Sequence, residues 1–321
     1  MSHAHPVCRE IEPDLLAVAV GEAAPVAAER VEGHVARCGA CREELRSYRA
    51  IDGLVGTLRR SPLPGDDATL ARAKLESRLA DLRSRLVGFG IFPSPLGPIL
   101  IARSELGVSL VRYLGGRGSM ASTIRRLLGE EAIEDRAATE ALHAELMEYL
   151  EGRRTRLDWP LDLRRARSDF QRRVLEVTAQ LPYGAVASYG GIARRIGAPS
   201  AARPVAQALR WNPLPIVIPC HRVIGSSGGL VGYAGKKIEL KQRLLTIEGV
   251  LTEPARRDFR VRREAMYALH TGETEYCLPT CGSLQSSPLS ELMLFGSRER
   301  AEAAGLAPCT TCRPDLHPLP A

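Results

Sequence analysis

The spacing of eight cysteines constrains this chain more than any other feature of its sequence. They fall into three groups: Cys8, Cys38 and Cys41; Cys220 alone; and Cys277, Cys281, Cys309 and Cys312. Pairs of cysteines separated by two or three residues are typical of zinc ligands, whereas disulfide frameworks belong to small secreted chains. The spacing therefore predicts a small zinc module near each end of the sequence, two ions in all, and a separate central part around Cys220.

Length and composition fit that division. A chain of 321 residues is long enough for two or three domains, and its 45% hydrophobic and 25% charged residues are normal for globular proteins. No apolar run approaches the ~18 residues of a membrane span, and the first residues lack the apolar core of a signal peptide. We expect a cytoplasmic protein that does not enter a membrane.

Residues 1–50 are predicted to form the first zinc module. His34, Cys38 and Cys41 follow the pattern H-x3-C-x2-C. Residues four apart share one face of a helix, so His34 and Cys38 can bind the same ion, and a turn brings Cys41 to it. Cys8 is the expected fourth ligand, with His3 and His5 as rivals. The spacing is similar to that of the zinc-binding anti-sigma family, whose module binds a protein partner or senses thiol oxidation; a purely structural zinc is the alternative.

The central cysteine is followed directly by a possible base. The short apolar run 216–218 predicts a buried strand that ends at Pro219, which would present Cys220 beside His221. A thiol with a proton acceptor at hand can become a nucleophile. A structural buried cysteine would explain the pair equally well if it stood alone.

The surroundings of Cys220 indicate a polyanionic partner. From Val177 to Ile238 there are 62 residues without Asp or Glu, although the chain average of 37 acids in 321 residues would give about seven. Several arginines and lysines lie in this window. An acid-free basic surface suits nucleic acid, whereas the net charge of +7 alone says little.

Periodicity predicts the remaining elements. Residues 51–88 contain an amphipathic helix over 68–86 and form a connector. Residues 89–165 form a small α/β subdomain with strands at 94–102 and 108–113 and a helix at 137–151. Residues 166–252 contain helices at 169–180, 189–196 and 200–210, with a break at 197–199 that suits a helix-turn-helix. Pro204 is tolerable only in the first turn, so the third helix should begin near Ala202. Residues 252–266 are expected to be a linker.

Together these segments predict a multidomain α/β protein: a small α/β subdomain and a helical, helix-turn-helix catalytic domain, flanked by two zinc modules.

The stretch Pro219-Cys220-His221-Arg222-Val223 lies between Asn212-Pro213 and the segments Gly232-Tyr233 and 244–249. With Pro182-Tyr183-Gly184 and Ser188-Tyr189, these motifs resemble the methylated-DNA–protein-cysteine methyltransferases over roughly 89–251. The resemblance implies stoichiometric transfer of an alkyl group from oxygen 6 of guanine, in double-stranded DNA, to Cys220.

The resemblance also implies a role for each matching residue. Cys220 attacks the alkyl carbon, His221 accepts its proton through a water, and Glu248 orients His221. Asn212 fixes the active-site turn, and Tyr189 donates a proton or hydrogen bond to the departing guanine. The expected substrate pocket consists of Pro219, Tyr233, Ala234 and Gly235. The expected DNA-binding residues are Ser200, Ala202, Arg203, Arg210 and Arg222, among which Arg203 would fill the space of the extruded base. Without the resemblance, Arg203 would be taken as an ordinary phosphate contact.

Residues 267–321 form the second predicted zinc module. Four cysteines in two close pairs, Cys277, Cys281, Cys309 and Cys312, suit a tetrahedral site. The segment resembles the zinc domain of Ada-type repair proteins, in which the first zinc cysteine accepts methyl groups from DNA phosphotriesters. Glu273 and Glu275 precede that position here, and no Lys or Arg separates Cys281 from Arg298. Since acids oppose phosphate binding, we expect a structural or partner-binding zinc.

Other functions remain open from the sequence. An alkylation- or redox-responsive regulatory DNA-binding protein would use the zinc modules as sensors. A non-catalytic lesion binder would not need Cys220. A cysteine hydrolase would need an oxyanion site, and the sequence marks none.

Overall fold

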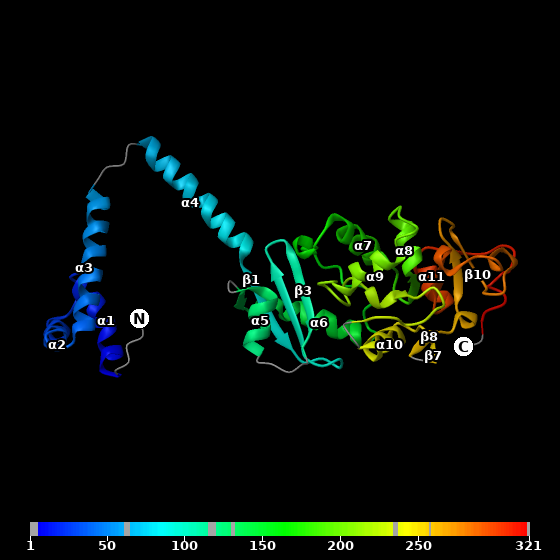
Figure 1. The fold of residues 1–321 in the computed structure, drawn as a ribbon, viewed down its shortest axis with the longest axis horizontal. Helices are drawn as coiled ribbons and strands as arrows, with labels where there is room; N and C mark the ends of the chain where they lie inside the picture. Colours follow the sequence, from blue (N-terminus) through cyan, green and yellow to red (C-terminus); the bar gives the residue numbers. More distant parts are fainter. Residues whose placement is uncertain are drawn as a thin grey trace. The chain divides into compact units, whose positions relative to one another are not determined.

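The computed structural model describes residues 6–60, 65–114, 120–129, 132–233, 237–256 and 258–319. The chain divides into two compact units, residues 1–79 and 80–321, and mixes helices with sheets as predicted (Figure 1). Among the described helices, none is long and apolar enough to span a bilayer.

The first unit is helical. It contains α1 (Pro6–Ala19), α2 (Pro25–Val35), α3 (Gly39–Arg60) and most of α4 (Gly65–Arg85). Pro25 occupies the first turn of α2, where its missing N–H has no cost. A small core joins the first three helices through Ile11, Leu15, Val31 and Leu45, together with Cys8 and Cys41. Helix α3 continues without a break past residue 50, into the segment expected to be the connector.

A four-stranded sheet begins the second unit. Its order is β3-β2-β1-β4, with β1 (Val87–Phe92), β2 (Ile99–Ser104), β3 (Gly107–Tyr113) and β4 (Ala132–Glu134). Helices α5 (Met120–Leu128) and α6 (Ala137–Leu150) follow β3 and β4. The sequence did not predict β1, and it placed the next strand too early. Residues 94–97 form a turn in which Gly97 N donates to Ser94 O at 3.0 Å, so the strand begins only at Ile99.

The predicted helices of the central region are confirmed. They are α7 (Asp169–Ala179), α8 (Tyr189–Arg195) and α9 (Ala202–Arg210), preceded by a short 3-10 helix η1 (Leu163–Arg165) and followed by α10 (Ile238–Ile247). Ser168 and Ser188 cap α7 and α8 by accepting hydrogen bonds from backbone N–H groups in the first turn. Helix α9 begins at Ala202, which places Pro204 in its first turn.

The predicted strand at 216–218 is wrong. These residues make a turn in which Ile218 N donates to Leu214 O at 2.8 Å, and Ile216 has a φ of 76°. Prolines at 213, 215 and 219 remove the backbone donors that a strand ladder needs. The run is apolar because the turn is buried, with Ile216 at 2% exposure. Cys220 lies just after it, in the 3-10 helix η2 (Cys220–Arg222).

The C-terminal segment does not stand apart from the central region. A six-stranded sheet has the order β12-β10-β9-β11-β5-β6. Strands β5 (Ala185–Ser188) and β6 (Val223–Ile224) come from the central region, and β9 (Tyr267–His270), β10 (Glu275–Cys277), β11 (Leu292–Phe295) and β12 (Ala307–Pro308) come from the tail. Strand β11 pairs antiparallel with β5. Two short 3-10 helices, η4 (Gly282–Leu284) and η5 (Leu289–Glu291), and helix α11 (Arg298–Ala303) complete the tail.

The expected linker at 252–266 is also wrong. It forms a hairpin of β7 (Thr252–Pro254) and β8 (Phe259–Val261), followed by the 3-10 helix η3 (Arg263–Ala265). The apolar residues between the charged ones explain why this segment is folded. Val261 is buried, and Leu230 N donates to Phe259 O at 2.8 Å, which ties the hairpin to the loop after β6.

Candidate functional site

The central site is assembled from segments that are far apart in the sequence. Asn212 follows α9, Cys220 and His221 lie in η2, Tyr233 lies in the loop before α10, and Glu248 caps the C-terminus of α10. All five side chains are buried. The structure therefore places together five of the residues that the sequence singled out.

Asn212 contacts both the turn and the thiol. Its Nδ2 donates to Ile218 O at 2.9 Å and to Cys220 Sγ at 3.2 Å, and its Oδ1 accepts from Leu214 N at 2.9 Å. Burial raises the pKa of the Cys220 thiol, against the opposing effects of Asn212 and of the Lys241 charge. The thiol thus stays protonated at neutral pH until a base removes its proton.

His221 is placed to be that base. Its Nε2 lies 2.6 Å from Glu248 Oε1, and both side chains are fully buried. Burial lowers the pKa of His221 despite the neighbouring carboxylate, so the imidazole is neutral. Because the ionised Glu248 accepts the N–H at Nε2, the other nitrogen, Nδ1, carries the lone pair. This buried Nδ1 has no hydrogen-bond partner in the part of the chain that the structure describes. It is the atom that can take a proton.

Glu248 stays ionised although it is fully buried. Burial alone would raise the pKa of its carboxyl, but the Arg222 charge and the hydrogen bonds from His221 and Arg222 outweigh burial and hold this pKa at about 2. Gly184 N donates to Oε2 at 3.1 Å, and the Tyr149 hydroxyl donates to Oε1. A buried carboxylate is stable only when it is paired and hydrogen-bonded in this way.

Arg222 was expected to bind DNA, but the fold buries its side chain. It is 5% exposed. Its Nε donates to Glu248 Oε2 at 2.8 Å, one terminal nitrogen donates to the Tyr149 hydroxyl at 3.0 Å, and the other donates to the Leu181 carbonyl. The guanidinium is the cation that Glu248 requires, so it points inward and is not available to DNA.

Two buried residues around the site were not foreseen. Tyr149 comes from α6, in the preceding subdomain, and nothing near it in the sequence marks it. Lys241 is fully buried, and its Nζ donates to Val223 O at 2.5 Å; burial lowers its pKa to about 8. A signal existed for Lys241, because it lies on the same face of α10 as the buried Leu244, Leu245 and Glu248.

Of the remaining pocket residues, Tyr189, Pro219 and Tyr233 lie near the thiol. The half-buried Tyr189 donates its hydroxyl to Val231 O at 2.9 Å, and burial raises the pKa of that hydroxyl, so it stays a donor. The Tyr233 hydroxyl lies 2.8 Å from that of Tyr113, a third unforeseen residue, and the Tyr233 ring meets His221 edge-on. Pro219 is buried. Ala234 and Gly235 lie outside the described residues.

The expected DNA-binding residues other than Arg222 lie at or near the surface. Ser200, Arg203 and Arg210 are exposed, and Ala202 is half-buried. Trp211, just after α9, is 48% exposed, and the Arg167 and Arg210 guanidinium groups lie 4.0 and 5.8 Å from its ring centre. The C-terminal end of α9 therefore places an exposed aromatic ring beside two guanidinium groups.

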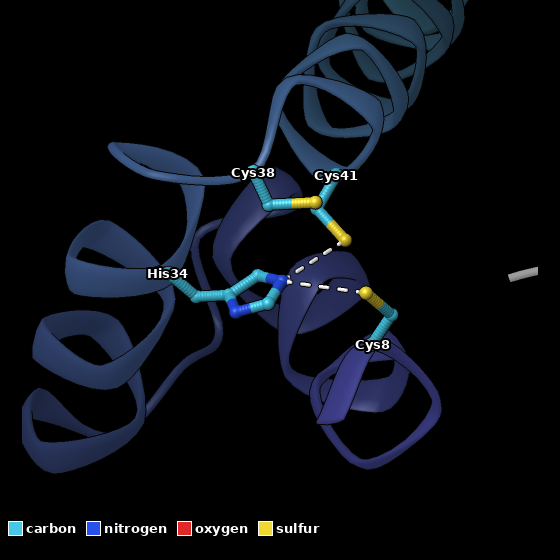
Figure 2. A group of neighbouring side chains, drawn as sticks. All are labelled: Cys8, His34, Cys38 and Cys41. Atoms are coloured by element: carbon cyan, nitrogen blue, oxygen red, sulfur yellow. Dashed lines mark hydrogen bonds between the residues drawn. The ribbon is translucent and has the colours of Figure 1, made fainter. Parts of the chain in front are cut away.

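The first cysteine cluster joins three helices (Figure 2). Cys8 comes from α1, His34 from α2, Cys38 from the loop just before α3, and Cys41 from the first turn of α3. Their ligand atoms all lie within 4.8 Å of one another. His34 Nε2 lies 3.2 Å from Cys41 Sγ and 3.7 Å from Cys8 Sγ. Three thiols and one imidazole fit a tetrahedral zinc ion. The rival ligands His3 and His5 lie outside the described residues.

The second cluster lies in the tail. Cys277, Cys281, Cys309 and Cys312 also place their sulfur atoms within 4.8 Å of one another. Leu278 N lies 3.3 Å from Cys312 Sγ, and the Ser283 hydroxyl lies 3.2 Å from Cys281 Sγ. Such donors stabilise thiolate ligands. The donor set again fits zinc.

Three family models match the chain. Residues 87–163 match the ribonuclease-like domain of 6-O-methylguanine DNA methyltransferase, and residues 169–250 match the DNA-binding domain of the same family. Residues 253–315 match the metal-binding domain of Ada.

Individual relatives agree with the models. A methylated-DNA–protein-cysteine methyltransferase of Methanosarcina acetivorans is 37% identical over 50% of this chain and 97% of its own length. The Mycobacterium tuberculosis protein of the same name is 39% identical over 51% of this chain and 93% of its own length. Among solved structures, that of M. tuberculosis OGT in complex with DNA is 37% identical, with a TM-score of 0.43, over 51% of this chain and 92% of that one.

The Glu248 network predicts a stability difference between two Tyr→Phe variants. Tyr149→Phe removes a hydrogen bond from a buried carboxylate and an acceptor from Arg222, and should cost about 2 kcal/mol. The matched control is Tyr276→Phe, whose hydroxyl donates to Glu302 Oε1 at 2.9 Å. Glu302 is 43% exposed and can turn to water, so the control should cost about 1 kcal/mol or less. Urea unfolding would measure both, and equal losses would contradict the role given to Tyr149.

Proposed function

Because the chain belongs to the methylated-DNA–protein-cysteine methyltransferases, we propose that it repairs DNA by moving a methyl or larger alkyl group from oxygen 6 of guanine to Cys220. The observation that carries this proposal is the neutral His221 next to the Asn212-bound thiol of Cys220. Glu248 holds its Nε2, and its buried Nδ1 has no hydrogen-bond partner among the described residues. In this proposal residues 89–165 and 166–252 form the transferase, and 1–50 and 267–321 are zinc modules.

The transfer is a displacement at the alkyl carbon. The Cys220 proton passes to His221 Nδ1, through a water in the family mechanism, and the thiolate sulfur attacks the alkyl group. A carbon–sulfur bond forms as the carbon–oxygen bond to guanine breaks. Tyr189 donates a hydrogen bond to the base, which limits the negative charge on the leaving guanine, and solvent completes its protonation. The buried Glu248 stabilises the imidazolium that results.

The product is a thioether at Cys220. Breaking its carbon–sulfur bond would need a further nucleophile, and the site supplies none among its described residues. Each chain is therefore consumed by one transfer.

DNA binding follows from the exposed surface of α9. Oxygen 6 of guanine lies inside the base stack, so the alkylated base must be extruded before it can reach Cys220. We propose that Arg203, exposed in the first turn of α9, fills the vacated space, and that Ser200, Ala202 and Arg210 contact the backbone. The match of residues 169–250 to the DNA-binding domain of the family supports this partner.

The zinc modules supply structure or regulation. We propose one ion at Cys8, His34, Cys38 and Cys41 and one at the tail cluster, and a protein partner for the first module. None of the eight cysteines, all of them described, forms a disulfide, which favours a reducing, cytoplasmic setting. The alternative function, an alkylation- or redox-responsive regulator, rests on these modules. Phosphotriester repair by Cys277 is less well supported, because that cysteine is 4% exposed and follows Glu273 and Glu275.

The acceptor assignment predicts a single modified peptide. After incubation with methylated duplex DNA, intact-mass analysis should show one added methyl group, and peptide mapping should place it on Cys220. Cys220→Ser should abolish repair, because a serine hydroxyl is a far poorer nucleophile at neutral pH. Sustained multiple turnover, or full repair by the serine variant, would falsify the suicide mechanism.

The roles of Arg203 and Tyr189 predict different substrate dependences. Arg203→Ala should slow repair of duplex DNA by about tenfold or more while leaving the reaction with free alkylguanine nearly unchanged, because free base needs no extrusion. Tyr189→Phe should slow both reactions. Single-turnover rates with the two substrates measure this. Equal slowing by Arg203→Ala on both would rule out its proposed role in extrusion.

The metal assignment predicts about two zinc ions per chain. Elemental analysis of the purified protein should find them, and removal of residues 1–50 should take away one ion while base repair persists. The transferase in residues 80–321 forms a compact unit of its own, which is why repair should survive. Loss of repair in a truncated protein that remains folded would give the N-terminal module a direct role in catalysis or DNA binding.

A further inference from the structure

We infer that the C-terminal four-cysteine module is a built-in brace of the alkyl-transfer site, and that Gly296 and Arg300 are positioning residues for Glu248. This inference rests on the proposed function of Cys220 and His221. It starts from the observation that the tail contacts two backbone segments at Glu248: the turn at Gly184, whose N–H donates to the carboxylate, and Gly249, which follows Glu248 in the chain.

The first contact is made through Gly184. Its N–H donates to Glu248 Oε2 at 3.1 Å, and its carbonyl accepts from Gly296 N, at the end of β11, at 2.8 Å. Gly184 has a φ of 73°, a conformation that favours glycine. The same peptide segment is therefore held by the tail on one side and holds the carboxylate on the other.

The second contact is made at the end of α10. A Cβ on Gly296 would lie 2.5 Å from the Gly249 carbonyl oxygen, so the tail backbone lies directly against the residue that follows Glu248. Arg300, in α11, places its guanidinium 4.4 Å from the centre of the Tyr183 ring. The Tyr183 hydroxyl in turn donates to Ile247 O at 3.0 Å, just before Glu248.

The tail also packs on the helix that carries Tyr189. The Ser188 hydroxyl donates to Leu289 O at 3.2 Å, and Arg194 pairs with Glu291 at 3.0 Å. A shared core lies beneath these contacts. It combines central-region residues with tail residues and three of the tail cysteines: Val186, Ile224, Leu245 and Val250 with Met266, Leu292, Leu294, Cys277, Cys281 and Cys309.

This arrangement distinguishes the chain from the Methanosarcina acetivorans relative. A relative whose whole length is nearly covered by half of this chain has no room for such a module, so the family chemistry does not in general need one. Here the edge of β5 is paired with β11, and its residues Ala185 and Val186 are fully buried. The geometry of Glu248 has thus come to depend on the tail in this chain.

The test compares two glycine variants of the full, zinc-loaded chain. Gly296→Ala should push β11 away from Gly249 and loosen Glu248. At Gly282, in the same module, an added Cβ would meet no atom of the described residues within 4 Å. We expect Gly296→Ala to slow single-turnover methyl transfer to Cys220 by about tenfold or more, with zinc content and DNA affinity unchanged. Gly282→Ala should match the parent protein.

The pH dependence of the transfer rate distinguishes a loss of Glu248 positioning from a general destabilisation of the protein. Glu248 raises the pKa of His221 against the effect of burial. If the Glu248–His221 hydrogen bond is loosened, the His221 pKa should fall. The rise of the transfer rate with pH should then move to lower pH, and the maximal transfer rate at high pH should be smaller. NMR titration of histidine-labelled protein, with His221 assigned by a His221→Gln variant, follows the same shift without DNA.

The outcomes are distinct. Parent-like rate, pH profile and His221 titration in a folded Gly296→Ala variant would overturn the inference. If that variant loses zinc or unfolds, Arg300→Gln replaces it: a slower rate with a shifted profile supports the brace, and parent-like values refute it. If the parent protein itself transfers no methyl group, the proposed function fails, and the His221 titration alone still decides whether the tail positions Glu248.

Discussion

A buried carboxylate is the interaction on which the rest of the site depends. Glu248 has no exposure to water, and it remains ionised because Arg222, His221, Tyr149 and Gly184 satisfy both of its oxygens. An uncompensated charge in that position would cost several kcal/mol. Each partner is thereby fixed as well: the imidazole in one tautomer, the guanidinium pointing inward, and α6 against the catalytic half. The positions of these side chains are thus set by the need to satisfy the buried Glu248 anion.

The same constraint joins parts of the chain that the sequence shows as separate. Tyr149 brings in the α/β subdomain, Gly184 brings in the turn before β5, and through Gly296 the tail reaches the same carboxylate. The six-stranded sheet provides the frame, since β11 continues the sheet that begins with β5 and β6. The two zinc clusters differ in this respect. The tail cysteines share a core with the transferase, whereas the N-terminal cluster has its own small core within the first unit.

The pKa values of the two reacting groups are shifted in the directions that alkyl transfer requires. Burial raises the pKa of Cys220 and lowers that of His221, so thiol and imidazole are both neutral before DNA arrives. The proton has to move from Cys220 to His221 only when an alkyl group is within reach of the sulfur. A buried neutral thiol is also protected from oxidation, since the thiolate is the reactive form.

The sequence by itself determined the local features: the helices with strong periodicity, the start of α9 imposed by Pro204, the two metal clusters, and the set of Cys220, His221, Asn212 and Glu248. These depend on near-neighbour spacing or on motifs that survive without knowledge of the fold. Tertiary structure alone decided that Arg222 faces a buried acid rather than DNA, that the apolar run 216–218 turns instead of extending, and that residues 252–266 form a hairpin. It also recruited Tyr149, which lies 99 residues from Glu248 in the chain. The direction in which a charged or apolar side chain points depends on which partner the fold brings to it, and no pattern along the chain specifies a partner so distant.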